Sequence, residues 1–126
     1  MNHTPKLLGF LGERYAAQYL KSKGYEIIGA NFTIRGGEID LIARHNGLLV
    51  FVEIKTRTGK SFGTGDESFN HMKKRRIVRA VERYVQTIPP HGRIEDPDYR
   101  IDLIEVELDP ATNALKNIYH HEDVDL

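Results

Sequence analysis

The chain has 126 residues, of which 40% are hydrophobic and 29% are charged, and this composition predicts one globular domain spanning residues 1–126. The absence of cysteine excludes disulfides, thiolate metal ligands and cysteine nucleophiles, and it is typical of a reducing, cytoplasmic environment. The longest apolar run, Leu48 to Val52, is far shorter than the roughly 20 residues that span a bilayer, so no membrane partner is expected.

The formal net charge of zero conceals an uneven distribution along the chain. Lysine and arginine outnumber aspartate and glutamate by 16 to 8 in residues 1–93, whereas the count is 2 against 10 in residues 94–126. Such asymmetry indicates either a surface that binds a polyanion or a solvated surface on which charges happen to segregate.

The first elements predicted are a helix and a strand. Thr4-Pro5 is a capping pair that starts a helix running through Lys21. At about 100° per residue, Glu13 lies on the same helical stripe as the packable residues Gly9, Ala16, Ala17 and Leu20. From Tyr25 to Ile34, β-branched and aromatic residues predict a strand.

The next segment predicts a β-hairpin. Two runs rich in apolar residues, Glu38 to Arg44 and Leu48 to Arg57, flank Asn46-Gly47, and Asn-Gly between such runs indicates a two-residue turn. With that turn, the numbers of paired residues sum to 93. This register places Asp40 opposite Glu53 and Glu38 opposite Lys55 on one face of the hairpin.

The remaining elements complete the fold prediction. Residues 58–67 form a Gly-rich loop that either closes over a substrate or simply connects two elements. It leads into a second helix, capped by Thr64 or Ser68, that ends before Pro89. Strands follow at Tyr99 to Leu108 and near Asn117 to His120. The order αβββαββ predicts an α/β fold in which helices flank a mixed β-sheet.

The pair Asp40 and Glu53 carries the strongest chemical signal. Directly opposed residues have Cβ atoms about 5 Å apart, and like charges at that distance repel. A divalent cation, Mg²⁺ or Mn²⁺, resolves this conflict because it accepts hard oxygen ligands, including the main-chain carbonyl of Ile54. Lys55, on the same face, would lie beside the attacking water or the scissile phosphate.

An alternative reading makes this hairpin an ordinary surface element, in which Glu38 and Lys55 form an ion pair and Asp40 faces water. Three apolar residues on the same face argue against it, namely Ile42, Leu49 and Phe51. The carboxylates therefore adjoin the core, and a buried carboxylate needs a partner or a metal.

Gly36 to Ile42 followed by Phe51 to Arg57 resembles the PD-(D/E)XK nuclease motif. From about Leu8 to His120 the chain more closely resembles the YraN family of small bacterial proteins, through Gly12-Glu13, Ala17, Leu20, Asn31, the two strand motifs and Lys73. The resemblance implies a restriction-endonuclease-like fold similar to archaeal Holliday-junction resolvases. It also implies catalytic roles for Asp40, Glu53 and Lys55, with Glu13 as an additional acidic residue. Ile39 stands where the motif has proline.

Basic residues after the motif are candidates for binding phosphate. Arg57 extends the face of Lys55, and Lys73 lies on the inward side of the second helix, either toward the active site or as a snorkelling lysine. Arginines are expected to share the outward face of that helix, where they grip a nucleic-acid backbone or merely meet solvent: Arg75, Arg76, Arg79 and Arg83. The histidines show no ligand spacing, and Asp102 is either a partnered inward carboxylate or the sign of an edge strand.

These observations predict a metal-dependent endonuclease that hydrolyses phosphodiester bonds in branched or otherwise structured DNA. The alternative is an inactive nucleic-acid-binding or scaffold protein that keeps the nuclease fold. DNA is favoured over RNA as the partner, although no base-reading motif distinguishes them. Because one active site cuts one strand, a homodimer would be needed for symmetrical cleavage.

Overall fold

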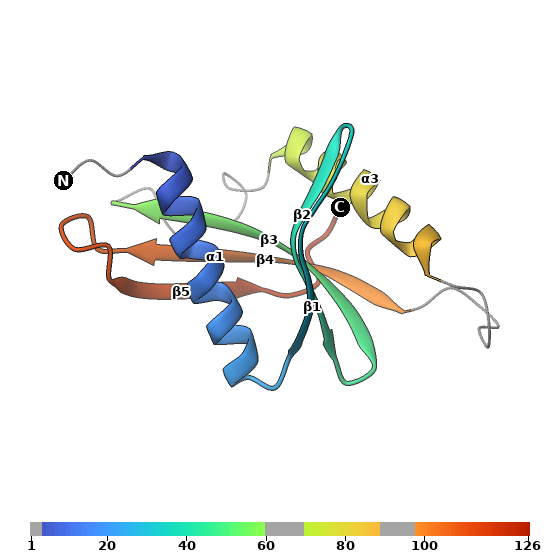
Figure 1. Cartoon of the computed structure of the whole chain (residues 1–126), viewed down its shortest axis with the longest axis horizontal. Helices are drawn as coiled ribbons and strands as arrows, with labels where there is room; N and C mark the ends of the chain where they lie inside the picture. Colours follow the sequence, from blue (N-terminus) through green and yellow to red (C-terminus); the bar gives the residue numbers. More distant parts are fainter. Residues whose placement is uncertain (1–3, 60–69, 89–97) are drawn as a thin grey trace.

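A computed structural model describes residues 4–59, 70–88 and 98–126. Within them the elements follow the predicted order αβββαββ (Figure 1): α1 (Pro5–Ser22), β1 (Glu26–Ile34), β2 (Gly37–His45), β3 (Leu48–Thr58), α3 (His71–Thr87), β4 (Tyr99–Leu108) and β5 (Leu115–His121). The predicted α/β class and element order are confirmed. No helix in these described ranges combines the length and the apolar character needed to cross a bilayer.

The five strands form one mixed sheet in the order β1-β2-β3-β4-β5. Neighbouring strands are antiparallel except for β3 and β4, which are parallel. This exception is expected because parallel strands require a crossover connection, and α3 lies between β3 and β4 in the chain. Figure 1 shows α1 lying across β3, β4 and β5, and α3 alongside the β1–β2 hairpin.

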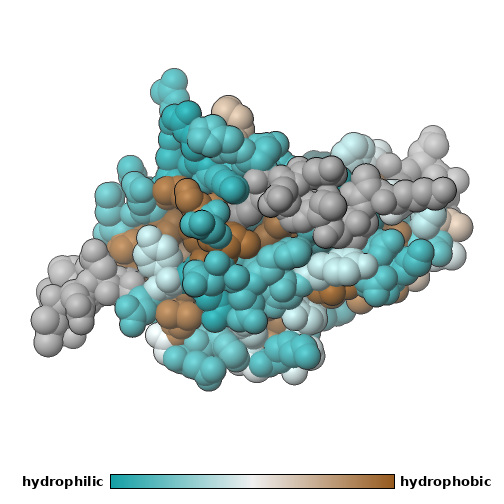
Figure 2. Space-filling model, turned by 180° about the vertical axis from the view of Figure 1, so that it is seen from behind, coloured by the Kyte–Doolittle hydropathy of each residue, from teal (hydrophilic) through white to brown (hydrophobic). Residues whose placement is uncertain are grey.

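Apolar side chains pack on both faces of this sheet. The α1-side core consists of Ala16, Leu20, Tyr25, Leu41, Ala43, Val50, Val52, Ile54, Ile104, Val106 and Leu108. The α3-side core consists of Ile39, Ile42, Leu49, Phe51, Ile77, Ala80, Val81, Ile101 and Leu103. The surface seen in Figure 2 is largely hydrophilic, with a limited hydrophobic area.

The predicted hairpin register is confirmed from the turn as far as the pair Leu41–Val52, and the predicted pairs Asp40–Glu53 and Glu38–Lys55 lie beyond the end of this ladder. Asn46 and Gly47 both have positive φ, 52° and 78°, as a type I′ turn requires. Paired residues run from His45–Leu48 to Leu41–Val52, and each pair sums to 93. The apolar residues expected beside the carboxylates, Ile42, Leu49 and Phe51, all lie in the α3-side core.

The predicted N-terminal cap is confirmed for α1 and corrected for α3. Thr4 caps α1 as predicted, and its hydroxyl accepts a hydrogen bond from the Leu7 amide at 3.1 Å. The cap of α3 is Asn70, whose side chain accepts from the Lys73 amide at 3.1 Å. The prediction of Thr64 or Ser68 as this cap was wrong, and both lie outside the described residues. Asparagine and serine are about equally good caps, so the sequence alone does not select one of them.

Gly37, the first residue of β2, is the position where the sheet meets the backbone of α3. A Cβ added there would lie 2.5 Å from the carbonyl oxygen of Arg76 and 3.2 Å from the amide nitrogen of Ala80. Both atoms belong to the helix backbone, which cannot move aside as a side chain can. Glycine is therefore required for β2 and α3 to approach this closely.

Replacing Gly37 with alanine is expected to lower the free energy of unfolding by roughly 1–3 kcal/mol because the added methyl group forces α3 away from β2. Urea unfolding followed by circular dichroism would measure this loss. Gly9→Ala is a matched control, since its added Cβ meets nothing within 4 Å and alanine favours a helix. Equal stabilities of the two variants would contradict the expected close packing.

Asp102 is a partnered inward carboxylate, which settles the alternatives left open by the sequence. It is fully buried, and β4 lies between β3 and β5, so the strand is not an edge. Asp102 accepts hydrogen bonds from Arg100 Nε at 3.0 Å and from the Asp123 amide at 2.9 Å, and His120 Nε2 lies 2.7 Å away. Burial alone would raise the pKa of Asp102, but the hydrogen bonds outweigh it and the pKa is lowered.

Candidate active site

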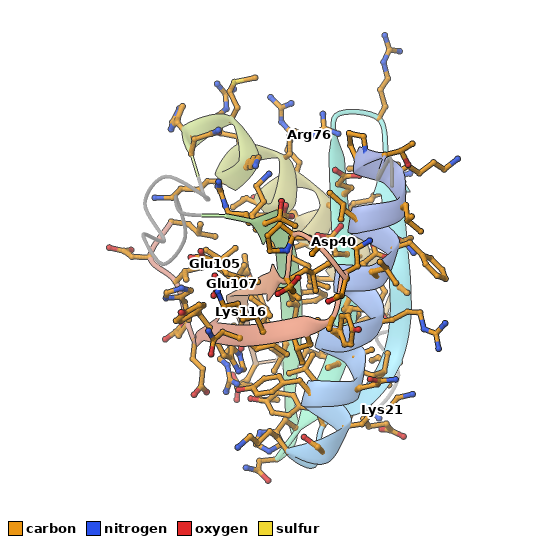
Figure 3. All side chains as sticks on the ribbon, turned by 90° about the vertical axis from the view of Figure 1, so that its left-hand side faces the viewer. Lys21, Asp40, Arg76, Glu105, Glu107 and Lys116 are labelled. Atoms are coloured by element: carbon orange, nitrogen blue, oxygen red, sulfur yellow. The ribbon has the colours of Figure 1, made fainter. Side chains whose placement is uncertain are left out.

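The four residues proposed for catalysis meet in one open cleft of about 610 Å³ between α1 and α3. It is lined by Pro5, Leu8, Gly9, Glu13, Asn31, Glu38, Asp40, Glu53, Ile54, Lys55, Thr56, Lys73 and Arg76. In Figure 3, Arg76 projects from α3 above Asp40. Residues that are up to 71 positions apart, from Pro5 to Arg76, thus share one surface.

A gap in the pairing of β1 with β2 lies beside Asp40 in this cleft. Residue pairs flank the irregular position on both sides, at Ala30–Leu41 and at Phe32–Ile39. Between them, Asn31 has a left-handed φ of 52°. Leu41 belongs to the α1-side core, whereas Ile39 belongs to the α3-side core. The hairpin therefore changes its buried face at Asn31 and Asp40, where the side chains reach the boundary between the two cores.

Asp40 also ends the ladder between β2 and β3. One residue beyond the last backbone pair, Leu41–Val52, its carboxylate oxygen Oδ2 accepts a hydrogen bond from the Ile54 amide at 2.7 Å. Asp40 is half-buried. The alternative in which Asp40 simply faces water is therefore wrong, because this carboxylate is held against β3 by the backbone of Ile54.

Burial and mutual repulsion make both acidic groups at the base of the cleft hard to ionise. Burial raises the pKa of Asp40 to about 6, and the nearby charges of Glu13 and Glu38 add to this rise although the Ile54 amide opposes it. Burial raises the pKa of Glu53 to about 8, and the charge of Asp40 is the second cause. The pair therefore shares about one proton at neutral pH unless a cation is bound.

Positive groups surround this pair. Lys55 lies close enough to lower the pKa of both Asp40 and Glu53, and Arg76 also lowers that of Glu53. Glu13, contributed by α1, has a pKa that is raised by burial and by Glu38 and is lowered by a hydrogen bond from Asn31. The cleft thus combines partly buried acids with flexible cations, an arrangement common at catalytic sites.

The oxygen atoms at the base of the cleft fit a hard divalent cation. Asp40 and Glu53 offer carboxylate oxygens, and Ile54, which also lines the cleft, would add its main-chain carbonyl oxygen as a further ligand. Among the described residues, no three acidic, histidine or cysteine side chains form a ready-made metal cluster. A Mg²⁺ site of two carboxylates, one carbonyl and several waters needs no third acidic side chain.

The structure corrects the expected grouping of the arginines. Arg76 lines the cleft together with Lys73, so the prediction that four arginines share an outward face was wrong for Arg76. Arg75 and Arg79 line a separate hollow of about 260 Å³ with His71, Lys74, Val78 and Leu126. Arg83 is exposed. Arg76 is the neighbour in sequence of the buried Ile77, and the cleft lies on the side of α3 near Ile77.

Arg57 is not among the described residues that line the cleft, although the alternation of β3 places it on the face of Lys55. It is half-buried and is paired in register with Glu107 on β4. Two residues along a strand correspond to about 6.6 Å, which carries Arg57 past the end of the cleft. The expected contact of Arg57 with the scissile phosphate therefore receives no support from its position.

Two polar cleft residues were given no role by the sequence, Asn31 and Thr56. Asparagine within a run of β-branched and aromatic residues is a signal for a left-handed position, and this signal marks Asn31. Thr56 looks like any β-branched strand residue. His120 and His121 point to opposite faces of the sheet, where they contact Asp102 and Glu105 respectively.

The protein has a mixed five-stranded sheet with helices on both faces, and its elements follow the order αβββαββ. Acidic residues lie where β2 and β3 diverge. These features together define a restriction-endonuclease-like domain. The resemblance seen in the sequence is confirmed by comparison with known proteins. The chain belongs to the family described as uncharacterised protein family UPF0102, the YraN-type family, whose model matches residues 12–106.

Relatives cover most of this chain and most of their own length. A UPF0102 protein of Caldanaerobacter subterraneus subsp. tengcongensis is 40% identical over 115 residues, which are 91% of each chain. A UPF0102 protein of Symbiobacterium thermophilum is 40% identical over 117 residues, 90% of this chain and 96% of the relative. A UPF0102 protein of Alkaliphilus oremlandii is 44% identical over 105 residues, 82% and 86% of the two chains.

Proposed function

We propose that this protein is a metal-dependent endonuclease that hydrolyses phosphodiester bonds in branched or otherwise structured DNA. The observation that carries the proposal is the pair Asp40 and Glu53. Both carboxyl groups are partly buried and their pKa values are raised by burial and by each other. Such an arrangement is costly for folding alone, and it becomes favourable when a divalent cation is bound.

A divalent cation at this site would polarise the phosphate and promote attack by water. The chain supplies the remaining groups. Lys55 lies beside the two carboxylates, where its ammonium can orient the attacking water and offset the charge that develops on the phosphorus centre. Water adds to phosphorus, the bond to the leaving oxygen breaks, and that oxygen takes up a proton. The products are a phosphate monoester and an alcohol.

Cationic side chains on α3 support a polyanionic substrate. Lys73 and Arg76 of α3 form the wall of the cleft opposite α1. A nucleic-acid strand that reaches Asp40 would therefore pass between these two residues and α1. Arg79, with Lys74 and Arg75, lines the hollow on another side of α3, and Arg83 is exposed one turn further on. We assign Arg79 and Arg83 to contacts with backbone phosphates outside the cleft, which add affinity without reading sequence.

The alternative function is binding without cleavage. A nuclease fold can outlive its activity, and the same cationic groups would then hold nucleic acid for a partner protein. The acidic pair favours the enzyme, because a protein that only bound a polyanion would gain nothing from two carboxylates, Asp40 and Glu53, beside Lys73 and Arg76.

The test is a cleavage assay on linear, flapped and four-way-junction DNAs, with single-stranded RNA for comparison, in the presence of Mg²⁺ or Mn²⁺. Wild type is expected to cut at least one DNA, and Asp40→Asn is expected to cut it at least about 100-fold more slowly because the cation is no longer held. Asp98→Asn, at an exposed position before β4, is the matched control. Calorimetric titration with Mn²⁺ is run on all three proteins.

Two outcomes would overturn the proposal that the protein is an endonuclease. Absence of both Mn²⁺ binding and cleavage in the wild-type protein would leave the nucleic-acid-binding alternative. Cleavage that persists in Asp40→Asn would place the chemistry elsewhere in the chain or in a contaminant.

A further inference from the structure

Asn31 forms the wall of the cleft on the edge strand β1, and nothing in the proposed chemistry so far uses it. It lines the cleft with Glu13 and Asp40, and its backbone is left-handed, with a φ of 52°. Residues other than glycine rarely adopt this conformation, although asparagine tolerates it better than most. A position that only needed the backbone shape would accept glycine, so the side chain invites a separate explanation.

The left-handed backbone opens the β1–β2 ladder beside Asp40. The flanking pairs Ala30–Leu41 and Phe32–Ile39 keep one register, and no backbone pair joins Asn31 to Asp40 between them. A regular pair there would hold Asp40 within the ladder between β1 and β2. Because the ladder is interrupted, the Asp40 carboxylate is able to reach the amide of Ile54 on β3.

The side-chain amide of Asn31 connects β1 with α1. It donates a hydrogen bond to Glu13, and this bond opposes the effect of burial on that carboxyl group. Glu13 in turn lies near enough to Asp40 for its negative charge to raise the pKa of Asp40. A donor that prefers the ionised carboxylate keeps the oxygens of Glu13 inside the cleft and fixes their orientation.

We propose that Asn31 is a positioning residue of the cation site: its left-handed backbone opens the ladder beside Asp40, and its amide holds Glu13 as an outer acidic partner of the cation bound by Asp40 and Glu53. This inference rests on the proposed metal dependence and extends it to Asn31, a residue outside the Asp…Glu-X-Lys motif that acts through Glu13. Partners that orient ligands from outside the inner set typically change metal affinity by 10- to 100-fold when removed.

A double-mutant cycle tests the coupling. Mn²⁺ affinity is measured by calorimetry, without nucleic acid, for wild type, Asn31→Gly, Glu13→Gln and the double variant. Glycine keeps the left-handed backbone and removes only the amide. Each single change is expected to weaken Mn²⁺ binding about tenfold, and the double variant is expected to bind no more weakly than the weaker single variant, because both changes remove the same interaction.

A spectroscopic measurement on the metal-free protein gives a second readout. The side-chain amide resonances of Asn31 are expected to move in Glu13→Gln, because the acceptor loses its charge, and to stay in place in Glu82→Gln, an exposed glutamate on α3. Asn31→Ala separates backbone from side chain, since alanine is strained at this φ. It is expected to lower the melting temperature relative to Asn31→Gly.

The outcomes distinguish this inference from the proposed activity. Wild-type Mn²⁺ affinity in Asn31→Gly, or fully additive losses in the double variant, would overturn the role of Asn31 and leave the endonuclease standing. Coupled losses without any cleavage would support Asn31 and overturn the endonuclease. A wild-type chain that binds no Mn²⁺ would overturn both.

Discussion

Without metal, Glu53→Gln is expected to be more stable than wild type at pH 8, although it removes a residue at the centre of the cleft. In the folded protein the pKa of Glu53 is raised from 4.5 to about 8, so above pH 4.5 the unfolded chain releases this proton more readily than the folded one. Wild-type stability therefore falls as pH rises from about 4.5 to about 8. Glutamine does not titrate, and the variant avoids this loss.

Urea unfolding at pH 5 and pH 8 in a chelating buffer measures the effect. The difference in unfolding free energy between Glu53→Gln and wild type is expected to change by ~2–4 kcal/mol in favour of the variant between these pH values, as a pKa shift of this size implies after allowance for its coupling to Asp40. Taking the difference cancels the titrating groups that do not interact with Glu53, including the Asp102 network.

Metal and a control variant complete this experiment. Mn²⁺ at pH 8 should raise the stability of wild type, since it binds only the folded state, and should affect Glu53→Gln much less. Glu82→Gln, exposed on α3, should follow wild type at both pH values. A pH profile that is the same for Glu53→Gln and wild type would show that Glu53 is not buried in an acidic pair.

Lys55→Met is expected to slow cleavage by about 10²- to 10⁴-fold while it changes Mn²⁺ affinity by less than about tenfold. Methionine retains most of the volume of the lysine chain and removes its charge. The charge acts on the reacting phosphate and water in this proposal, whereas Asp40 and Glu53 hold the cation. Single-turnover cleavage and calorimetric titration with Mn²⁺ measure the two quantities on the same preparation.

The control for Lys55→Met is Lys21→Met, an exposed lysine at the end of α1, which should cleave at the wild-type rate. Cleavage by Lys55→Met at the wild-type rate would remove Lys55 from the chemistry. A loss of Mn²⁺ affinity as large as the loss in rate would instead give Lys55 a structural role in the cation site.

Short-range patterns explain most of what was predicted correctly. The Asn46-Gly47 turn sets the hairpin register through its own backbone conformation, and a side-chain period of 2 then fixes which of residues 41–52 face α3. The same local logic gives the start of α1 at Thr4 and the bounds of β4. Because Asp40, Glu53 and Lys55 lie on one such hairpin, their gathering in the cleft was already encoded in a segment of 16 residues.

Other features depend on neighbours that are distant in the chain. Periodicity placed Arg76 and Arg79 on one arc of a helix, but α1 and β2 decide that Arg76 borders the cleft and Arg79 a different hollow. The sequence left two interpretations of Asp102, a partnered inward carboxylate or the sign of an edge strand. The partners that decide between them are His120 on β5 and the Asp123 amide in the segment after it. A pattern within one element cannot report which groups other elements bring to it.

The sequence by itself therefore determined the order of the elements, the register of the central hairpin and the acidic pair on it, because turn conformation and side-chain alternation act over a few residues. Only the tertiary structure decided that β1 breaks its ladder at Asn31, that Glu13 of α1 faces this break, and that Arg57 lies beyond the cleft. These positions follow from sheet twist and from the packing of two helices on opposite faces, which depend on the whole chain at once.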